Sequence, residues 1–342
     1  MKILITGGCG FVGSNLAIFL KKKFKKAKII CLDNLTRKGS LLNKNRLKNY
    51  GIKNYNLNIE NYNKIKNLPK FNLVIDCCAE PAIEVSKTDP DRVFKTNLIG
   101  TFNILKKCTK DNADIIFLSS SRVYSINKLR NLLKNNNLTK PINIKTKINE
   151  NFETSYASSL YGFTKLASEK LIKEIFFSTK LKYIINRFGV IAGPWQFGKQ
   201  DQGFVPLWVA KHFLKSKLTY IGFGGNGYQV RDLIHIDDVC SIIYLQIKKL
   251  KKINNLTLNI GGGPKNSISL KSLTNKCEKL TGNSIRINKI PMTSSFDIPY
   301  YVTDNSKFLK FYKKKHFKNI DLILKDIYVW LKNTKKIWSH FK

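Results

Sequence analysis

Short apolar runs alternate with longer amphipathic stretches over most of the chain. The runs occupy residues 2–6, 29–32, 55–59, 73–78, 115–118, 182–186 and 256–260. Largely apolar runs of this length are typical of strands in a parallel sheet that is covered on both faces. Helices are predicted near residues 11–20, 61–67, 91–110 and 158–178. The alternation predicts an α/β fold, a Rossmann doubly wound parallel sheet.

The pattern loosens in two regions. Residues 125–155 are rich in Asn and Lys and predict a long loop or insertion with one helix. Beyond residue 187, glycine-rich turns separate short elements, and one strand is predicted near residues 285–290. We therefore predict a first domain from residues 1–187 plus about 232–260. A smaller, discontinuous C-terminal lobe would comprise about 188–231 plus 261–342.

The formal net charge of +39 raises the question of a nucleic-acid partner. Only 8 of the 61 basic residues are Arg, whereas a surface that reads phosphates and bases favours the planar guanidinium. The lysines are spread along the whole chain together with abundant Asn and Ile. We interpret them as a solvated basic surface and predict no nucleic-acid partner. The charge would still attract an anionic substrate.

The cysteines, the histidines and the hydropathy of the chain argue against a disulfide-linked, metal-binding or membrane-spanning protein. Seven cysteines without a C-x-x-C pair predict free, buried thiols, and four scattered histidines lack the spacing of metal ligands, so no metal is expected. No apolar run reaches the roughly 18 residues of a membrane helix. The first apolar run ends at Gly7 and Gly8, unlike a signal peptide. We expect a cytoplasmic protein without a membrane partner.

A glycine-rich loop joins the first strand to the first helix, with the pattern G-x-x-G-x-x-G formed by Gly7, Gly10 and Gly13. Such glycines allow a tight turn, a close approach to a pyrophosphate, and close packing of helix on strand. Asp33 ends the second strand 20 residues after Gly13, where its carboxylate would bind the adenosine ribose and repel a 2′-phosphate. The loop and Asp33 predict a dinucleotide site that prefers NAD to NADP. Arg37 and Lys38 lie nearby and weaken this preference, because their positive charges would favour the 2′-phosphate of NADP.

A second group of polar residues follows the fifth strand. Tyr161 and Lys165 are four positions apart and would share one face of the predicted helix. Ser119–Ser121 ends the fifth strand, and sheets of this kind carry functional groups at their carboxyl edge. Alone, these residues are equally compatible with an amphipathic helix and a helix cap. Their position after the dinucleotide loop favours a catalytic group.

Together these elements resemble the extended short-chain dehydrogenase/reductase family, the NAD-dependent nucleotide-sugar epimerases and dehydratases. The resemblance covers nearly the whole chain and includes the stretches 97–103, 231–238 and 259–262. It implies that Tyr161 is the general acid/base toward a sugar hydroxyl. It implies that Lys165 binds the nicotinamide ribose and favours the phenolate of Tyr161. Ser120 would hydrogen-bond the reacting oxygen.

The resemblance also assigns binding residues. The cofactor residues it implies, besides Tyr161 and Lys165, are Gly7, Gly10, Phe11, Val12, Gly13, Asp33, Asn34, Lys38 and Asn97. The substrate residues are Ser121, Asn186, Tyr220 and Arg231. Arg231 would pair with a nucleotide diphosphate, unless it forms an ion pair with Asp232. His235 and residues 237–238 are interpreted as a helix cap. A homodimer or homotetramer is expected from the apolar surface of the helix near 158–178.

The residues after Ser120 discriminate between sugar reactions. At the two positions after this serine, dehydratases of the family carry Asp and Glu, and decarboxylating relatives carry a Glu. This chain has Ser121 and Arg122 at those positions. This favours epimerisation, in which one carbon is oxidised to a keto sugar and reduced again with bound NAD. The stretches 33–40, 195–203 and 224–232 resemble the CDP-paratose 2-epimerase branch, which implies a CDP-linked sugar. A UDP-sugar 4-epimerase and a non-catalytic NAD-binding regulator stay open as alternatives.

Overall fold

The computed structural model describes the chain except residues 134–137, 157, 200–201, 315 and 342. The chain forms two units, and each is assembled from separate segments. The first comprises Met1–Val123, Ser159–Arg187 and Val239–Leu258. The second comprises Tyr124–Ser158, Phe188–Asp238 and Asn259–Lys342.

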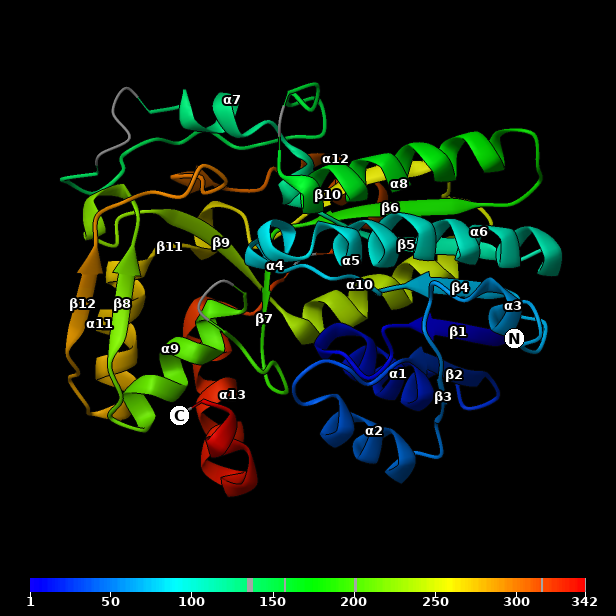
Figure 1. The fold of residues 1–342 in the computed structure, drawn as a ribbon, viewed down its shortest axis with the longest axis horizontal. Helices are drawn as coiled ribbons and strands as arrows, with labels where there is room; N and C mark the ends of the chain where they lie inside the picture. The colour runs from blue at the N-terminus through cyan, green and yellow to red at the C-terminus, as the bar shows by residue number, and fades with distance from the viewer. Residues whose placement is uncertain (134–137, 157, 200–201, 315, 342) are drawn as a thin grey trace. The chain divides into compact units, whose positions relative to one another are not determined.

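A seven-stranded sheet forms the centre of the first unit (Figure 1). Its spatial order is β10 (Leu256–Ile260), β6 (Tyr183–Phe188), β5 (Asp114–Ser120), β4 (Leu73–Asp76), β1 (Lys2–Thr6), β2 (Lys28–Asp33) and β3 (Lys53–Asn56). The pairs from β3 to β5 are parallel, with Ile3 opposite both Ile29 and Leu73. Because strand order reverses at β1, the sheet is doubly wound. The predicted fold class is confirmed, and each predicted run overlaps one strand.

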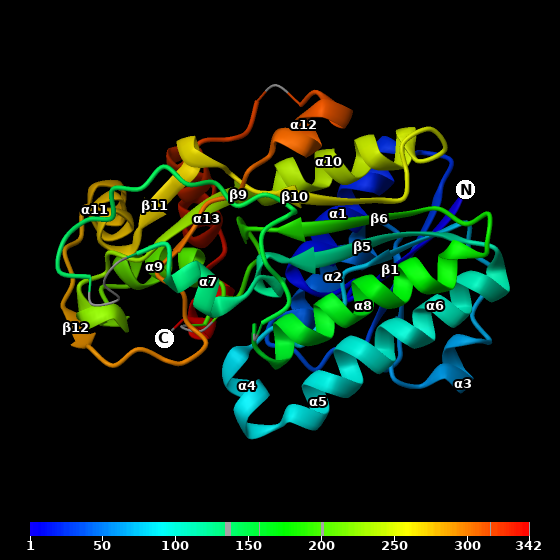
Figure 2. The ribbon, with the colours of Figure 1, turned by 90° about the horizontal axis from the view of Figure 1, so that it is seen from above.

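Helices cover both faces of this sheet (Figure 2). On one face lie α8 (Leu160–Phe177), α6 (Gly100–Asp111) and α5 (Pro90–Phe94), and on the other lie α1 (Phe11–Lys23) and α10 (Ile236–Lys249). The π-helical turn Lys95–Ile99 joins α5 to α6. The three together form a continuous helical segment where a helix near 91–110 was predicted. The remaining helices of the unit are α2 (Ser40–Asn49), α3 (Tyr62–Ile65) and α4 (Ile83–Thr88).

A continuous apolar core lies between the sheet and the helices α6 and α8. Its fully buried members include Leu4, Val74, Ile115, Ile104 and Ile172. Burial of this surface drives the sheet and helices together. Polar residues are therefore concentrated where the strands end, and the carboxyl ends of β1, β2, β4 and β5 lie along one edge of the sheet.

The second unit contains two small sheets. In one, β9 (Val230–His235) pairs with β11 (Ser267–Ser269), β13 (Tyr300–Tyr301) and β7 (Val190–Ala192). In the other, β8 (Leu218–Ile221) and β12 (Ile287–Ile290) form a parallel pair, visible in Figure 1. The helices are α7 (Ile126–Arg130), α9 (Phe204–Phe213), α11 (Leu270–Thr281), α12 (Ser306–Tyr312) and α13 (Ile320–Asn333).

The stretch Tyr124–Ser158 belongs to the second unit, whereas the division from sequence places it with the first domain. The Tyr124 hydroxyl donates to Asn259 Oδ1 over 2.6 Å. The backbone N–H of Ile148 donates to the carbonyl of Val302 over 2.8 Å. These bonds join residues more than a hundred positions apart. The local pattern of apolar and polar residues therefore could not predict them. The stretch is largely irregular and includes the short helix α7, as its composition predicts.

None of the helices in the described ranges is both long and apolar enough to cross a membrane. All seven cysteines are free, as predicted, but only five are buried, because Cys77 and Cys78 are partly exposed. Burial is the main reason that the pKa of Cys9 rises to about 12. This thiol of the glycine-rich loop is therefore protonated and a poor nucleophile near neutral pH.

Candidate active site

The loop between β1 and α1 is a tight turn that leads into the helix N-terminus. Gly7 has φ of 58°, and the Gly10 N–H donates to the Gly7 carbonyl over 3.0 Å. A Cβ on Gly13 would lie 2.2 Å from that carbonyl, so only glycine permits this approach of helix and loop. Gly10 is the N-cap and offers no side chain. The N–H groups of Phe11, Val12 and Gly13 in the first turn can therefore face a phosphate.

Asp33 ends β2 next to this loop. Its Oδ2 accepts the N–H of Cys9 over 3.0 Å, and its Oδ1 accepts the N–H of Leu35 over 2.8 Å. Burial raises the pKa of Asp33, while backbone N–H groups and the charge of Arg37 oppose the rise. A carboxylate held at this point suits the hydroxyls of an adenosine ribose. The other two predicted cofactor residues of the segment are exposed: Asn34 and Lys38.

Asn97, which the resemblance assigns to the cofactor, holds neighbouring segments together in this structure. It is completely buried in the π-helical turn. Its Oδ1 accepts the Glu80 N–H over 2.7 Å, and its Nδ2 donates to the Glu80 carbonyl and to Thr164 Oγ1. The amide is thus occupied by the loop after β4 and by α8. Asn97 thus positions Glu80 and α8, and its contact with the cofactor stays a prediction.

Ser120 is the last residue of β5, and its Oγ accepts the N–H of Arg122 over 3.1 Å. Ser121, the first residue of the 3₁₀ turn Ser121–Val123, follows directly. Tyr161 is the second residue of α8, which begins after Ser159. The Ser159 hydroxyl caps the helix by accepting the N–H of Gly162 over 3.0 Å. The cap explains why the helix starts immediately before the tyrosine.

Lys165 joins this helix to the end of β5. Its side chain is buried, and Nζ donates to the Leu118 carbonyl over 3.0 Å and to the Cys78 carbonyl over 3.5 Å. Leu118 lies two residues before Ser120 on the same strand. Because Tyr161 and Lys165 share a helix face, this contact places the tyrosine-bearing face at the carboxyl end of β5. The arrangement brings a hydroxyl, a phenol and an ammonium group to one strand end.

A buried ion pair braces this region, and the sequence reading did not identify it. Glu169, one turn after Lys165, accepts hydrogen bonds from Arg187: Nε lies 3.0 and 3.1 Å from the two carboxylate oxygens, and Nη2 lies 2.7 Å from Oε2. The Ser119 hydroxyl donates to the same carboxylate over 2.5 Å. The four-residue spacing of Lys165 and Glu169 indicates in the sequence that both side chains lie on one face of α8. The partner on β6 depends on strand order and could not be read locally.

Asn186, predicted to contact the substrate, also joins two elements of the fold. It lies inside β6, is fully buried, and exchanges two side-chain hydrogen bonds of 2.8 and 2.9 Å with Gln246 of α10. These bonds use its amide to hold α10 against the sheet. Asn186 therefore packs α10 against the sheet, and a substrate contact at this residue stays a prediction.

The two predicted substrate residues of the second unit are both engaged. The Tyr220 hydroxyl donates to Thr274 Oγ1 over 2.7 Å, and its buried ring stacks on Trp208. Arg231 donates from Nη2 to Asp297 Oδ1 over 3.1 Å and to a backbone carbonyl. The ion pair of Arg231 is thus with Asp297 and not with its neighbour Asp232. These contacts hold its guanidinium in a fixed direction near the start of β9.

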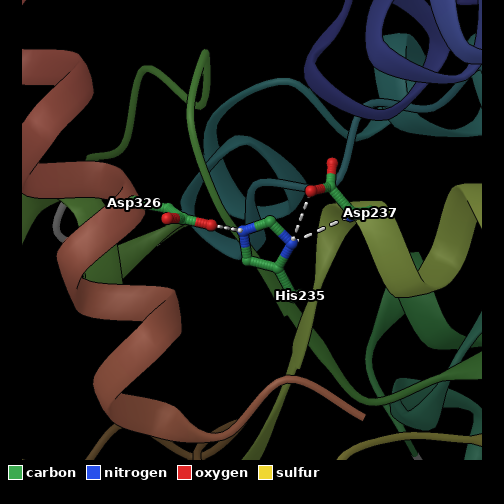
Figure 3. A group of neighbouring side chains, drawn as sticks. All are labelled: His235, Asp237 and Asp326. Atoms are coloured by element: carbon green, nitrogen blue, oxygen red, sulfur yellow. Dashed lines mark hydrogen bonds and ion pairs between the residues drawn. The ribbon is translucent and has the colours of Figure 1, made fainter. Parts of the chain in front are cut away.

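His235, Asp237 and Asp326 form a compact group in the second unit (Figure 3). The Asp237 N–H donates to His235 Nδ1 over 3.0 Å, so the neutral ring carries its proton on Nε2, toward Asp326. Burial is the main reason that the pKa of His235 is lowered, which favours that neutral form. Lys318 Nζ lies 2.8 Å from both carboxylates. With its cation position taken by Lys318 and Nε2 protonated, the group does not fit a metal ion.

Comparisons with known proteins agree with these motifs. Residues 3–261 match the model of the NAD dependent epimerase/dehydratase family, and the chain belongs to that family. It is 30% identical over 319 residues to a CDP-paratose 2-epimerase of Salmonella typhi, covering 90% of this chain and 92% of the relative. It is 32% identical over 266 residues to a dTDP-D-glucose 4,6-dehydratase of Dictyostelium discoideum, covering 76% and 58%.

A solved structure supports the fold over the whole length. The UDP-glucuronic acid 4-epimerase of Bacillus cereus, in complex with UDP-glucuronic acid and NAD, superposes with a TM-score of 0.81 at 23% identity. The match covers 97% of this chain and 99% of that chain. NAD is the cofactor of the family, and this chain fits it. The close approach at Gly13, where a Cβ would lie 2.2 Å from the Gly7 carbonyl, and the Asp33 carboxylate beside Cys9 suit a pyrophosphate and a ribose.

Proposed function

We propose that this chain is a nucleotide-sugar epimerase that inverts one carbon of a CDP-linked sugar, with C2 as the position. One observation carries the choice of reaction. The Ser120, Tyr161 and Lys165 group is complete, while Ser121 and Arg122 stand where a dehydratase would need an acid and a base. Elimination of water requires a second proton donor and acceptor, and simple oxidation and re-reduction of a hydroxyl does not.

The chain's own residues would divide the work as follows. Tyr161 removes the proton of the sugar hydroxyl and later returns it, and Ser120 Oγ hydrogen-bonds the same oxygen. Lys165, held by the Leu118 carbonyl, supplies a positive charge that favours the phenolate. When bound, NAD supplies the hydride acceptor and donor. Glycines of the loop and Asp33 hold and orient the dinucleotide, which is retained between turnovers.

The second unit would supply contacts to the nucleotide. Arg231 is the proposed partner of the diphosphate, because a guanidinium already oriented by Asp297 loses little freedom on binding. The aromatic pair of Tyr220 and Trp208 is proposed to support the wall near the base. Ser121 is proposed to contact the sugar.

We propose a homodimer or homotetramer assembled through α8 of the first unit. Phe163 is 54% exposed and Phe177 is 90% exposed on this helix, more than a monomer surface usually leaves uncovered at aromatic residues. Sedimentation equilibrium should therefore give at least twice the monomer mass. Replacing Phe163 by Ser should shift the equilibrium toward monomer, whereas Val329→Ser, on the second unit, should not.

A UDP-sugar 4-epimerase is the second candidate, favoured by the fold match to a 4-epimerase. It would use the same Ser120, Tyr161 and Lys165 and differ in which carbon faces the nicotinamide. A non-catalytic NAD-binding regulator is less well supported, because the tyrosine and the lysine are both present.

Direct assays separate these candidates. Purified protein is incubated with CDP-paratose and, separately, with UDP-glucose, and inversion at C2 or C4 is followed by proton NMR. We expect inversion at C2 of the CDP-sugar and retention of bound NAD. Tyr161→Phe should abolish turnover while NAD stays bound, and Tyr156→Phe serves as a matched control. Inversion at C4 would favour the second candidate, and failure of both sugars would contradict the epimerase proposal.

A further inference from the structure

A buried carboxylate after β4 holds two arginines. Glu80, with a side chain only 5% exposed, receives Arg37 Nη1 on Oε1 over 2.8 Å and Arg92 Nη2 on Oε2 over 2.8 Å. Arg37 comes from the turn after β2, and Arg92 comes from α5. One carboxylate thus joins three separate segments of the first unit. Neither the dinucleotide loop nor the Ser-Tyr-Lys group accounts for this arrangement.

Glu80 is anchored firmly enough to set the position of Arg37. Its backbone N–H and carbonyl are both bound by the buried side chain of Asn97, over 2.7 and 3.1 Å. The Ala82 N–H lies 3.4 Å from the Oε1 that holds Arg37. Because the backbone of Glu80 is held at both polar groups, the carboxylate cannot follow a departing guanidinium. The more exposed partner, Arg37, is the group that would have to move.

Arg37 stands in the segment that recognises the adenosine ribose. It lies four residues after Asp33, and its positive charge acts on that carboxylate, opposing the rise of the Asp33 pKa. An arginine near this strand end is the usual partner of a 2′-phosphate. A guanidinium engaged with a buried carboxylate must break a charge-assisted hydrogen bond before it can pair with a phosphate.

We propose that Glu80 is a specificity-determining residue that favours NAD over NADP by holding Arg37 away from the position of a 2′-phosphate. Asp33 disfavours the 2′-phosphate by direct repulsion, and Glu80 holds the nearby guanidinium of Arg37, which could otherwise compensate. Arg92, which belongs to α5, contacts the second carboxylate oxygen of Glu80. It therefore stabilises Glu80 but is not a candidate ligand of the phosphate. The proposal rests on the NAD site and not on the sugar reaction.

The test compares dinucleotide binding in a background where direct repulsion is absent. The variants are D33N, D33N/E80Q, D33N/R92Q, D33N/R37Q and D33N/E80Q/R37Q. Dissociation constants for NAD and NADP are measured by calorimetry after retained nucleotide has been removed. The dinucleotide carried through purification is identified by chromatography.

We expect E80Q to raise the NADP-to-NAD affinity ratio of D33N about tenfold, the value of one charge-assisted hydrogen bond regained by a phosphate. Adding R37Q should return the ratio to that of D33N. The matched control, R92Q, should change the ratio by less than about twofold, because it cuts the same carboxylate cluster without releasing Arg37.

An unchanged ratio in D33N/E80Q, with a thermal unfolding midpoint close to that of D33N, would overturn the proposal. If E80Q prevents folding, D33N/R37Q decides alone. The proposal requires that R37Q leave NADP affinity unchanged while Glu80 is present, and a loss of affinity would show that Arg37 already binds the phosphate. These ratios are independent of sugar turnover. Failure of the epimerase assay therefore leaves the inference standing, whereas loss of all dinucleotide binding removes its basis.

Discussion

The ion pair between Glu169 and Arg187 should be among the most costly contacts to break in the first unit. Both side chains are almost fully buried, at 1% and 7% exposure, and three contacts of 2.7 to 3.1 Å join them. Replacing Arg187 by Met leaves a buried carboxylate whose remaining side-chain partner is Ser119. Cutting a buried pair in this way costs about 3–5 kcal/mol, because the remaining charge is desolvated without compensation.

Removing both charges should cost less than removing one. In Glu169→Gln/Arg187→Met, the glutamine still accepts the Ser119 hydroxyl, and no charge is left buried. The double variant should therefore regain about 2 kcal/mol relative to Arg187→Met alone, within the range of coupling between contacting residues. The exposed pair of Glu84 and Lys87 is the matched control. Its removal should cost at most about 1 kcal/mol.

Urea unfolding followed by far-UV circular dichroism measures these differences. All four tryptophans, Trp195, Trp208, Trp330 and Trp338, lie in the second unit. Tryptophan fluorescence consequently reports on that unit and should shift less than the dichroism does. The reasoning is refuted if Arg187→Met unfolds within about 1 kcal/mol of the parent, or if the double variant is no more stable than the single one.

Three further predictions use the same unfolding and binding measurements. Gly13→Ala should abolish NAD binding, because its Cβ would lie 2.2 Å from the Gly7 carbonyl; retained affinity in calorimetry would contradict the geometry. Burial lowers the pKa of His235, so the stability contributed by its neutral ring is present above the unfolded pKa of about 6.5 and lost as pH falls below it. His235→Asn, which can still accept a backbone N–H, should show a flatter loss of urea midpoint between about pH 7 and pH 5, and parallel curves would argue against this origin. Lys107→Met should cost about 3 kcal/mol by leaving the buried Asp111 carboxylate without its cation, and a cost below about 1 kcal/mol would exclude that explanation.

The candidate residues most readily predicted from sequence are those whose roles would depend on their own neighbours. The glycines of the loop and Asp33 lie next to strand ends, and their spacing alone predicts a dinucleotide site. Tyr161 and Lys165 share a face because a helix repeats every 3.6 residues. The structure adds the atom that Lys165 contacts, the carbonyl of Leu118.

Two buried amides have partners that the sequence did not indicate. The resemblance assigns Asn97 to the cofactor and Asn186 to the substrate, and both roles stay predictions. In the folded chain each is hydrogen-bonded to a residue distant in sequence, Asn97 to Thr164 and Asn186 to Gln246. A buried amide requires such partners, but a single sequence does not say which residue provides them.

The sequence by itself determined the alternation of strands and helices, the glycine loop with its acidic strand end, and the Tyr161–Lys165 pair. Each follows from a local period or a short spacing. Tertiary structure alone decided that Glu80 holds Arg37 and that residues 124–158 pack with the second unit. The physical reason is the same in both cases. Such contacts depend on the order of the strands and on the connections between them, which bring distant segments together. The local sequence pattern of each segment does not specify which segment it will contact.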